Sequence, residues 1–306
     1  MHKFSLIIPL LGTQGHFEDT LATALRDLPT DCQVIVVHDG SYDDPYDLAS
    51  EVQFVVADPD AGFTDCLNIG LCYASGEFTV VVRPGIELAA GWAEAVATEF
   101  ENEQVASVVP VLLERDSMKR IVAAGIDSES NGTRRLVGLG KKLSRRSTKK
   151  MRPVGPSSWL AAYRTDVIKS LAPFDENLSD DYLDLDIAMS LKALGFTCAM
   201  SGDFSAAVFD PETVAQESPA GVSAQRICLR FSELLGSGTV ASVCSDLIRL
   251  PFGSWRMRHL LQRFSARQFA DLDLQYSTKL EKLAVSKPWQ AQPVESNEHH
   301  YLSKAA

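Results

Sequence analysis

The apolar run CQVIVV ends in residues that have the chemistry of a nucleotide site: His38, Asp39, Gly40 and Ser41, followed by Asp43. A carboxylate in this position can accept hydrogen bonds from the imide of a base and from ribose hydroxyls. Gly40 and Ser41 permit a tight turn that brings the backbone close to a ligand. Asp39 is therefore the first candidate for nucleotide binding and Asp43 the second, and a plain polar turn is the alternative.

A second apolar run, EFTVVV, ends in Arg83-Pro84-Gly85 and leads on to Glu87. A guanidinium donates paired hydrogen bonds to a phosphate without help from a metal, so Arg83 is a candidate contact for a diphosphate. A divalent metal ion needs oxygen ligands, and this tip carries no carboxylate. Glu87 could supply one oxygen, or it could begin the next element as a solvated charge.

A third group of side chains consists of Asp180, Asp181, Asp184 and Asp186. They precede or begin an amphipathic stretch, Leu185 to Leu194, which Gly195 should end. Considered alone, they are an acidic flank of the kind that the dipole of a helix favours at its N-terminus. We expect Asp186 to face away from a site or to cap the helix.

Strand-like and helix-like segments alternate about every twenty residues in this part of the chain. The strands are expected at 4–10, 32–38, 53–58 and 77–84, and the helices at 16–28, 44–52 and 64–75. The alternation predicts an α/β fold with a doubly wound, mostly parallel sheet and right-handed crossovers. Ligands of such sheets bind beyond the carboxyl ends of the strands. The tips at 10–12, 38–40 and 83–85 should therefore converge on one cleft.

The rest of the chain has a different character. Residues 134–152 are strongly basic and flanked by glycines, which predicts a loop. Helical patterns fill 212–285, and the polar tail 286–306 is expected to be disordered. The segment WRMRHLLQRFSARQF, at 255–269, combines arginines with an apolar stripe. Such a helix could lie on an anionic membrane surface, or it could pack against the main domain or a second subunit.

Composition narrows the classes of function. Apolar residues make up 45% of the 306 residues, as in soluble globular proteins, and the net charge of −11 argues against general nucleic-acid binding. No apolar run approaches the roughly 20 residues of a membrane span. Pro9 interrupts the N-terminal apolar run, which favours a buried strand over a signal peptide. The six cysteines lack CxxC spacing and predict reduced thiols of a cytosolic protein.

Five stretches, in order, resemble the family 2 glycosyltransferases and their relatives with the same nucleotide-sugar fold. They are SLIIPLLG, VIVVHDGSYDD, DAGFTDCLNIGLCYASGEF, GPSSWLAAYRTDVIKSLAPFDENL and DLDIAMSLKALGF. Together they cover about residues 3 to 210. The resemblance implies a GT-A-type domain of nucleotide-diphospho-sugar transferases over 1–211, followed by a helical C-terminal extension over 212–285.

The resemblance also implies an activity, which is inverting transfer of a sugar from a nucleoside-diphosphate sugar to a hydroxyl of a glycan or lipid-linked acceptor. Asp184 matches the general base that acts on the acceptor hydroxyl. The implied contacts to the nucleotide sugar are Pro9, Asp39, Gly40, Ser41, Asp43, Asp65, Asn68 and Arg83. For Asn68, a structural hydrogen bond from its helix to the neighbouring loop is the alternative.

The chain departs from the family at the metal site. Relatives usually hold Mg²⁺ or Mn²⁺ with an Asp-x-Asp-like tip, and here Gly85 stands at the position of the metal-binding aspartate. Leu183 replaces the glutamate of the acidic pair, and Asp210 takes the place of a histidine. We therefore predict that the chain has no metal site.

Three interpretations of Arg83 stay open. Arg83 could replace the cation, or the basic segment could close over the diphosphate as a lid, for which a solvated loop is the alternative. The side chains in question are Lys141, Lys142, Arg145, Arg146, Lys149 and Lys150. In the third interpretation catalysis is lost, and the protein is a non-catalytic nucleotide- or glycan-binding relative or a scaffold in polysaccharide assembly. We carry forward an active cytoplasmic transferase, which works at the inner face of the membrane if its C-terminal helices bind lipid.

Overall fold

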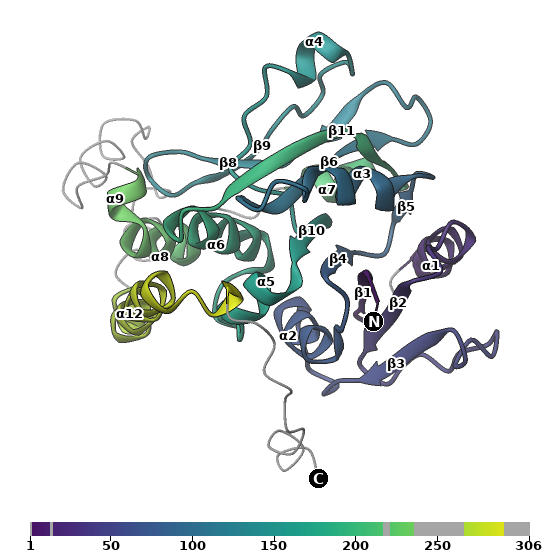
Figure 1. The fold of residues 1–306 in the computed structure, drawn as a ribbon, viewed down its shortest axis with the longest axis horizontal. Helices are drawn as coiled ribbons and strands as arrows, with labels where there is room; N and C mark the ends of the chain where they lie inside the picture. Colours follow the sequence, from purple (N-terminus) through teal and green to yellow (C-terminus); the bar gives the residue numbers. More distant parts are fainter. Residues whose placement is uncertain (1, 13–14, 217–220, 236–265, 291–306) are drawn as a thin grey trace, which may run out of the picture.

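The computed structural model describes residues 2–12, 15–216, 221–235 and 266–290 (Figure 1). Its centre is a sheet with α1 and α3 on one side and α2, α5 and α6 on the other (Figure 1). The strands of this sheet are β1 (Phe4–Leu10), β2 (Cys32–His38), β3 (Val52–Val56), β4 (Phe78–Val82), β5 (Ile86–Leu88), β6 (Val105–Glu114), β7 (Ile121–Ala123), β10 (Leu160–Arg164) and β11 (Thr197–Val208). Two further strands, β8 (Ile126–Ser128) and β9 (Arg134–Leu136), pair with each other.

The strand order is β3-β2-β1-β4-β10-β6-β11-β5, with β7 beside β6. The first four strands of this order are parallel, and Leu10 lies opposite His38 at the ends of β1 and β2. Every residue of β1 and of β4 is buried, because helices cover both faces and leave no position for a solvated side chain. The predicted doubly wound α/β fold is confirmed, with three parallel strand tips along one edge.

The other half of the sheet is mixed. Strand β10 runs antiparallel to both β4 and β6, and β5 runs antiparallel to β11. Parallel pairing returns between β6 and β11. The reversed strand β10 matters for the site, because it brings the residues just before Leu160 beside the tip of β4: the amide of Arg83 donates a hydrogen bond to the carbonyl of Trp159 at 3.0 Å.

The helices are α1 (Phe17–Arg26), α2 (Phe63–Tyr73), α3 (Trp92–Glu99), α4 (Arg145–Thr148), α5 (Thr165–Leu171), α6 (Asp180–Ala193), α7 (Pro211–Ala215), α8 (Val222–Arg230), α9 (Ser232–Leu235) and α12 (Ala270–Ser286). Helix α6 begins earlier than the apolar pattern predicts, so that Asp180 and Asp181 form its first turn. It ends as predicted at Gly195, which has a φ of 87°. The amide of Phe196 reaches back to the carbonyl of Leu191 at 3.0 Å, as in a Schellman cap.

The helix expected at 44–52 is absent, and turns occupy most of this segment. The Asp44 carboxylate accepts a hydrogen bond from the amide of Leu48 at 2.8 Å. Asp44 and Asp47 both have positive φ angles. Aspartate side chains that bond nearby amides offer the backbone an alternative to the helix, which explains why the prediction was wrong here.

The basic segment 134–152 is not a plain loop. It contains β9 and α4, and the side chain of Arg134 is buried. Met151 packs in a small apolar cluster with Val111, Leu113 and Ile121. The segment therefore has a fixed fold against β6 and β7, and the prediction of a loop is corrected.

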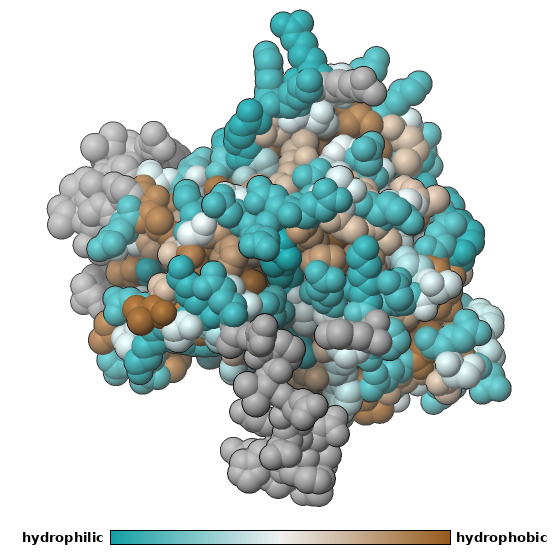
Figure 2. All heavy atoms as spheres, viewed as in Figure 1, coloured by the Kyte–Doolittle hydropathy of each residue, from teal (hydrophilic) through white to brown (hydrophobic). Residues whose placement is uncertain are grey.

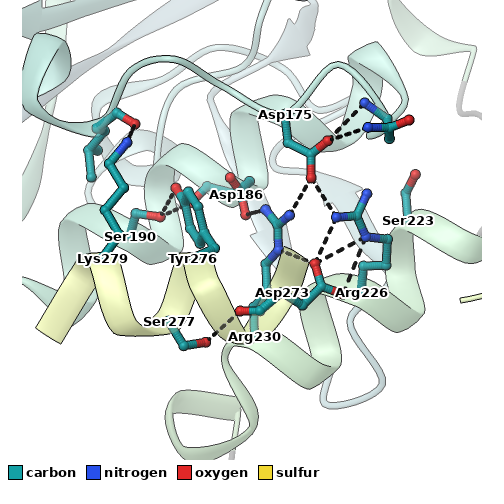
Figure 3. A network of polar contacts seen from close by, with 12 residues as sticks. Asp175, Asp186, Ser190, Ser223, Arg226, Arg230, Asp273, Tyr276, Ser277 and Lys279 are labelled. Atoms are coloured by element: carbon teal, nitrogen blue, oxygen red, sulfur yellow. Dashed lines mark hydrogen bonds and ion pairs between the residues drawn. The ribbon is translucent and has the colours of Figure 1, made fainter. Parts of the chain in front are cut away.

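The C-terminal helices α8 and α12 pack beside α6 (Figure 1). Figure 3 shows the buried polar network between them, which joins Asp175 and Asp186 to Arg226, Arg230 and Asp273. Order extends to Gln290, beyond the predicted start of the tail, and Trp289 lies against the ring of Phe196. The basic helix expected at 255–269 lies almost wholly outside the described residues, as does the tail at 291–306. Within the described ranges, no helix is both long and apolar enough to cross a bilayer.

Candidate functional site

The tips of β1 and β2 are joined through Asp39. Its carboxylate accepts a hydrogen bond from the amide of Gly12 at 3.0 Å and another from the amide of Ser41 at 3.0 Å. Hydrogen bonds from the side chain and backbone of Ser41, and from Gly12, hold the pKa of Asp39 below its ordinary value. Gly40 has a φ of 88°, a conformation that glycine adopts without strain. Asp39 is thus ionised and fixed, half-buried at the edge of the sheet.

A hollow of about 330 Å³ opens beside these tips. Its lining residues are Leu10, Gly12, His16, Phe17, Glu18, Asp19, Ser41 and Tyr42. Tyr42 stacks on Phe54 with ring centroids 5.7 Å apart and meets Phe17 edge-on at 4.9 Å. The volume is at the lower end of that of small-molecule sites, and an aromatic wall with adjacent polar groups is suited to a base and ribose.

The tip of β4 carries Arg83 between two aromatic rings. Its guanidinium carbon lies 4.3 Å from the centroid of Phe63 and 4.9 Å from that of Trp159. The nearest carboxylate is that of Asp180, with 3.6 Å between nitrogen and oxygen. Burial lowers the pKa of Arg83, whereas Asp180, Asp181 and Asp184 act in the opposite direction. The ordinary pKa of a guanidinium lies far above neutral pH, so Arg83 remains a cation there.

The position that a metal-binding aspartate would occupy is held by backbone interactions. Gly85 has a φ of 92°, its amide donates to Thr20 Oγ1 at 2.9 Å, and its carbonyl accepts from the amide of Phe209 at 3.0 Å. Glu87, the fallback ligand, lies in β5 and pairs with Arg115 at 3.0 Å. Among the described residues, no group of three or more His, Cys, Asp or Glu side chains could hold a metal ion. With a fixed arginine cation at the tip and a glycine in place of the metal-binding aspartate, these residues do not fit Mg²⁺ or Mn²⁺.

Asp184 is buried in α6 and paired with Arg134, which β9 supplies. Arg134 Nε donates to Asp184 Oδ1 at 2.9 Å, and Arg134 Nη2 donates to Oδ2 at 2.6 Å. The amide of Ser158 donates to the same Oδ2 at 2.9 Å. The space left beside the carboxylate is only about 10 Å³, no more than one water molecule requires. An acceptor hydroxyl therefore has no room to reach Asp184 in this arrangement.

Asp180 occupies the more accessible place on the same helix. Its side chain is 42% exposed, so that it faces both Arg83 and solvent. Partial burial raises the pKa of the Asp180 carboxyl, and the nearby Arg83 cation offsets part of this effect. A carboxylate that is reachable and has a raised pKa is better suited to accept a proton than one locked between an arginine and an amide.

The remaining predicted residues have structural contacts. Asp65 Oδ2 accepts a hydrogen bond from the amide of Gly62 at 2.8 Å and so caps α2. Asn68 exchanges two hydrogen bonds with the backbone of Phe174, at 2.7 and 3.1 Å. These contacts match the structural alternative for Asn68. Pro9 is buried within β1, and Asp43 is exposed in the loop after β2.

Sequence reasoning missed the partners that define this site, namely Arg134, Phe63 and Trp159. Arg134 falls in the segment predicted to be a loop. It lies two residues before the apolar Leu136, and this spacing could have indicated a strand with both side chains on one buried face. Trp159 stands directly before the apolar run of β10. No local pattern links any of these residues to Asp184 or Arg83.

Several solved structures have a fold similar to that of this chain. The structure of GalNAc-T7 with UDP, GalNAc and Mn²⁺ superposes with a TM-score of 0.60 at 12% identity, over 94% of this chain and 56% of that one. A mannosyltransferase from Pyrobaculum calidifontis, in complex with GDP-mannose and Mn²⁺, gives 0.50 at 16% identity over 95% and 76% of the two chains. S. aureus TarS gives 0.51 at 17% identity over 74% and 64%.

The chain spans little more than half the length of the GalNAc-T7 chain that it matches. No family model and no curated protein matches the sequence. At these identities the likeness shows the fold alone, which is the GT-A-type fold of nucleotide-sugar transferases, as the sequence resemblance implied.

Proposed function

We propose that this chain binds a nucleoside-diphosphate sugar at the tips of β1, β2 and β4 and transfers the sugar to a hydroxyl of a glycan or lipid-linked acceptor. The transfer inverts the configuration at the anomeric carbon of the sugar and uses no divalent metal ion. The observation that carries the proposal is the guanidinium of Arg83, held at the tip of β4 between Phe63 and Trp159. The donor class is supported by the shared fold, because the GalNAc-T7 and Pyrobaculum structures contain UDP and GDP-mannose.

Arg83 supplies the positive charge that the leaving diphosphate needs. Negative charge builds on that group as the bond to the sugar breaks, and a preorganised cation in a partly dry site stabilises it. The contact between Arg83 and Asp180, at 3.6 Å, is longer than a hydrogen bond of about 2.7–3.2 Å. A phosphate can therefore take over the donors of Arg83 without breaking a strong internal bond.

Binding of the diphosphate then prepares the base. Once Arg83 turns its hydrogen bonds to phosphate, Asp180 loses its cationic neighbour and its affinity for a proton rises. Asp180 accepts the proton of the acceptor hydroxyl as that oxygen attacks the sugar carbon and the diphosphate leaves. The role predicted for Asp184 stays a prediction, and it requires Arg134 to move away first.

A second function is favoured by the pair formed by Arg134 and Asp184. An arginine that neutralises the residue matching the family base, in a space of about 10 Å³, suits a protein that binds the nucleotide sugar without turnover. The two functions share the donor site and differ only in whether product forms.

Binding is tested first, by calorimetry with UDP, GDP and dTDP in EDTA and then in Mn²⁺. We expect one nucleotide to bind equally well in both buffers, and Arg83→Met to weaken it about 10- to 100-fold, as for a lost hydrogen bond to a charged group. Arg164→Met is the matched control, because Arg164 also lies over aromatic rings, Phe100 at 5.1 Å and Phe78 at 5.8 Å, but stands opposite the first residue of β4, away from these tips. Binding that requires Mn²⁺, or no binding of any nucleotide, would contradict the proposal.

Turnover is tested next, by release of nucleoside diphosphate from the donor that binds. We expect slow hydrolysis by the wild type, and a loss of about 100-fold in Asp180→Asn, the usual scale for a general base, with a donor affinity that does not fall. Binding without release, in the wild type and with a range of hydroxyl acceptors, identifies the non-catalytic alternative. A normal rate in Asp180→Asn would remove Asp180 from the mechanism.

A further inference from the structure

The strongest charge asymmetry of the molecule lies away from the strand tips. Residues 134–152 contain nine basic and no acidic residues, so the segment carries +9 and the rest of the chain −20. Its exposed cations are joined by two from the preceding loop. This basic face consists of Lys119, Arg120, Lys141, Lys142, Arg146, Lys149, Lys150 and Arg152, of which Arg120 also pairs with Glu114 at 3.7 Å.

Backbone pairing holds the two loops of the basic face together. Arg120 and Lys142 form an antiparallel bridge. The amide of Ile121 donates to the carbonyl of Lys141 at 2.8 Å, and the amide of Leu143 donates to that of Lys119 at 2.6 Å. Together with the buried side chain of Met151, these bonds fix the backbone from which the cations project. The cations of the basic face therefore project from a folded backbone.

Two apolar side chains stand exposed within the basic face. Met118 is 44% exposed next to Lys119, and Leu139 is 47% exposed near Lys141. Figure 2 shows hydrophilic side chains standing out over α4 at the top of the view. A cavity of about 480 Å³ opens between this segment and β11, and Lys149, Arg152, Met151 and Met200 are among its lining residues. Cations therefore surround apolar surface, both on the face and in the cavity.

We infer that the basic face docks the protein onto an anionic lipid bilayer. Lysine and arginine side chains are attracted to the negative surface of such a bilayer within a Debye length. Met118 and Leu139 can enter the boundary between headgroups and acyl chains, and the cavity offers a phospholipid headgroup both cations and apolar walls.

An anionic polymer fits the same charges less well. Proteins that bind single-stranded nucleic acid stack its bases on aromatic side chains, and residues 134–152 contain no aromatic residue. A polymer would also leave Met118 and Leu139 without a role. The apolar pair is thus what distinguishes lipid from polymer.

The test is co-sedimentation of the full chain with vesicles of phosphatidylcholine, with and without phosphatidylglycerol. We expect binding only when the anionic lipid is present, and its loss at about 1 M salt, where the Debye length is about 3 Å. The double variant Lys141→Gln/Lys142→Gln should bind roughly 25-fold more weakly. The matched control is Lys192→Gln/Lys282→Gln, which removes two exposed charges elsewhere and should bind as the wild type does.

The apolar contribution is tested with Met118→Ser/Leu139→Ser, which keeps every charge. We expect binding to anionic vesicles to fall about fivefold or more, with an unchanged circular dichroism melting curve. Equal binding by both double lysine variants, or equal binding to neutral vesicles, overturns the inference. So does binding to heparin or RNA, but not to vesicles, that is unaffected by Met118→Ser/Leu139→Ser, because that result identifies a polymer as the partner.

Discussion

Helix α6 carries a buried arginine–aspartate cluster on each of two sides, and the two clusters differ in balance. Toward the strand tips, Asp184 has one arginine, Arg134, and one backbone amide from Ser158. Toward the C-terminal helices, Asp186 shares Arg230 with two more carboxylates, Asp175 and Asp273 (Figure 3). Arg226 joins Asp175 and Asp273 as well.

The difference shows that burial and ion pairing do not by themselves mark a catalytic group. The Asp184 cluster is neutral and closed. The network around Asp186 has three carboxylates for two guanidinium groups, and burial raises the pKa of Asp186 although Arg230 opposes it. The first cluster fills a buried position beside the proposed donor site, and the second holds α8 and α12 against α6.

The largest effect is expected for Arg230→Met. This change leaves the buried carboxylates of Asp186 and Asp273 without their shared cation, and breaking a buried pair in this way costs about 3–5 kcal/mol. Urea unfolding should show the midpoint shifted to correspondingly lower urea. Arg26→Met is the control, since Arg26 pairs with Asp27 on the surface, and its loss should cost less than about 1 kcal/mol. Equal midpoints for the two variants would show that the network does not fasten the C-terminal helices.

The next effect is expected for Arg134→Met, at about 3 kcal/mol, because Asp184 is then buried without its partner. The double variant Arg134→Met/Asp184→Leu removes both charges and should recover most of this loss, as apolar replacements of buried pairs often do. Recovery would show that the pair is dispensable for folding and sharpen the contrast with the larger network. A double variant as unstable as Arg134→Met would instead give the pair a positioning role in the fold.

The strands and the Asp39 turn could be predicted because their causes are local. A strand covered on both faces is a nearly continuous apolar run, and β1, β2 and β4 each contain such a run. The Asp39 turn forms at a strand end that the sequence shows, and its carboxylate accepts a hydrogen bond from the amide of Ser41, two residues on. The end of α6 at Gly195 is also local, because the capping hydrogen bond joins Phe196 to Leu191, five residues apart in the sequence.

The partners of Asp184 and Asp186 could not be predicted, because they come from distant parts of the chain. Arg134 lies 50 residues before Asp184, and Arg230 lies 44 residues after Asp186. A match to a family motif can assign Asp184 a role, but only the fold shows which side chain occupies its oxygens. The aromatic neighbours of Arg83 could not be predicted either, because one belongs to α2 and the other directly precedes β10.

A smaller effect is expected for acid unfolding of Asp175→Asn. Burial alone would raise the pKa of Asp175, but hydrogen bonds from Arg226 and Asn177 outweigh it and hold the pKa at about 2, below the ordinary 3.8. A lowered pKa contributes stability above the ordinary value, and that stability is lost as the pH falls from about 4 toward 2. After allowance for solvent screening, Asp175→Asn should remove about 1 kcal/mol of this pH dependence. Denaturant melts at pH 2.5 and pH 6 measure it, with the exposed Asp203→Asn as the control. A variant whose stability falls with acid as steeply as that of the wild type would contradict this assignment.

The smallest effect on stability, and the sharpest test of the cleft side, is expected for Asp180→Asn. Its side chain is 42% exposed and meets Arg83 only at 3.6 Å, so the free energy of unfolding should change by less than about 1 kcal/mol. Arg83→Met is expected to weaken nucleotide binding, whereas Asp180→Asn should strengthen it. The reason is that, in the proposed site, Asp180 competes with the diphosphate for the guanidinium of Arg83. We expect affinity for the nucleoside diphosphate to rise about two- to fivefold, measured by calorimetry in EDTA. A fall in affinity would mean that Asp180 holds Arg83 in its binding position, and Arg83 would then resemble Arg134 as part of a closed pair.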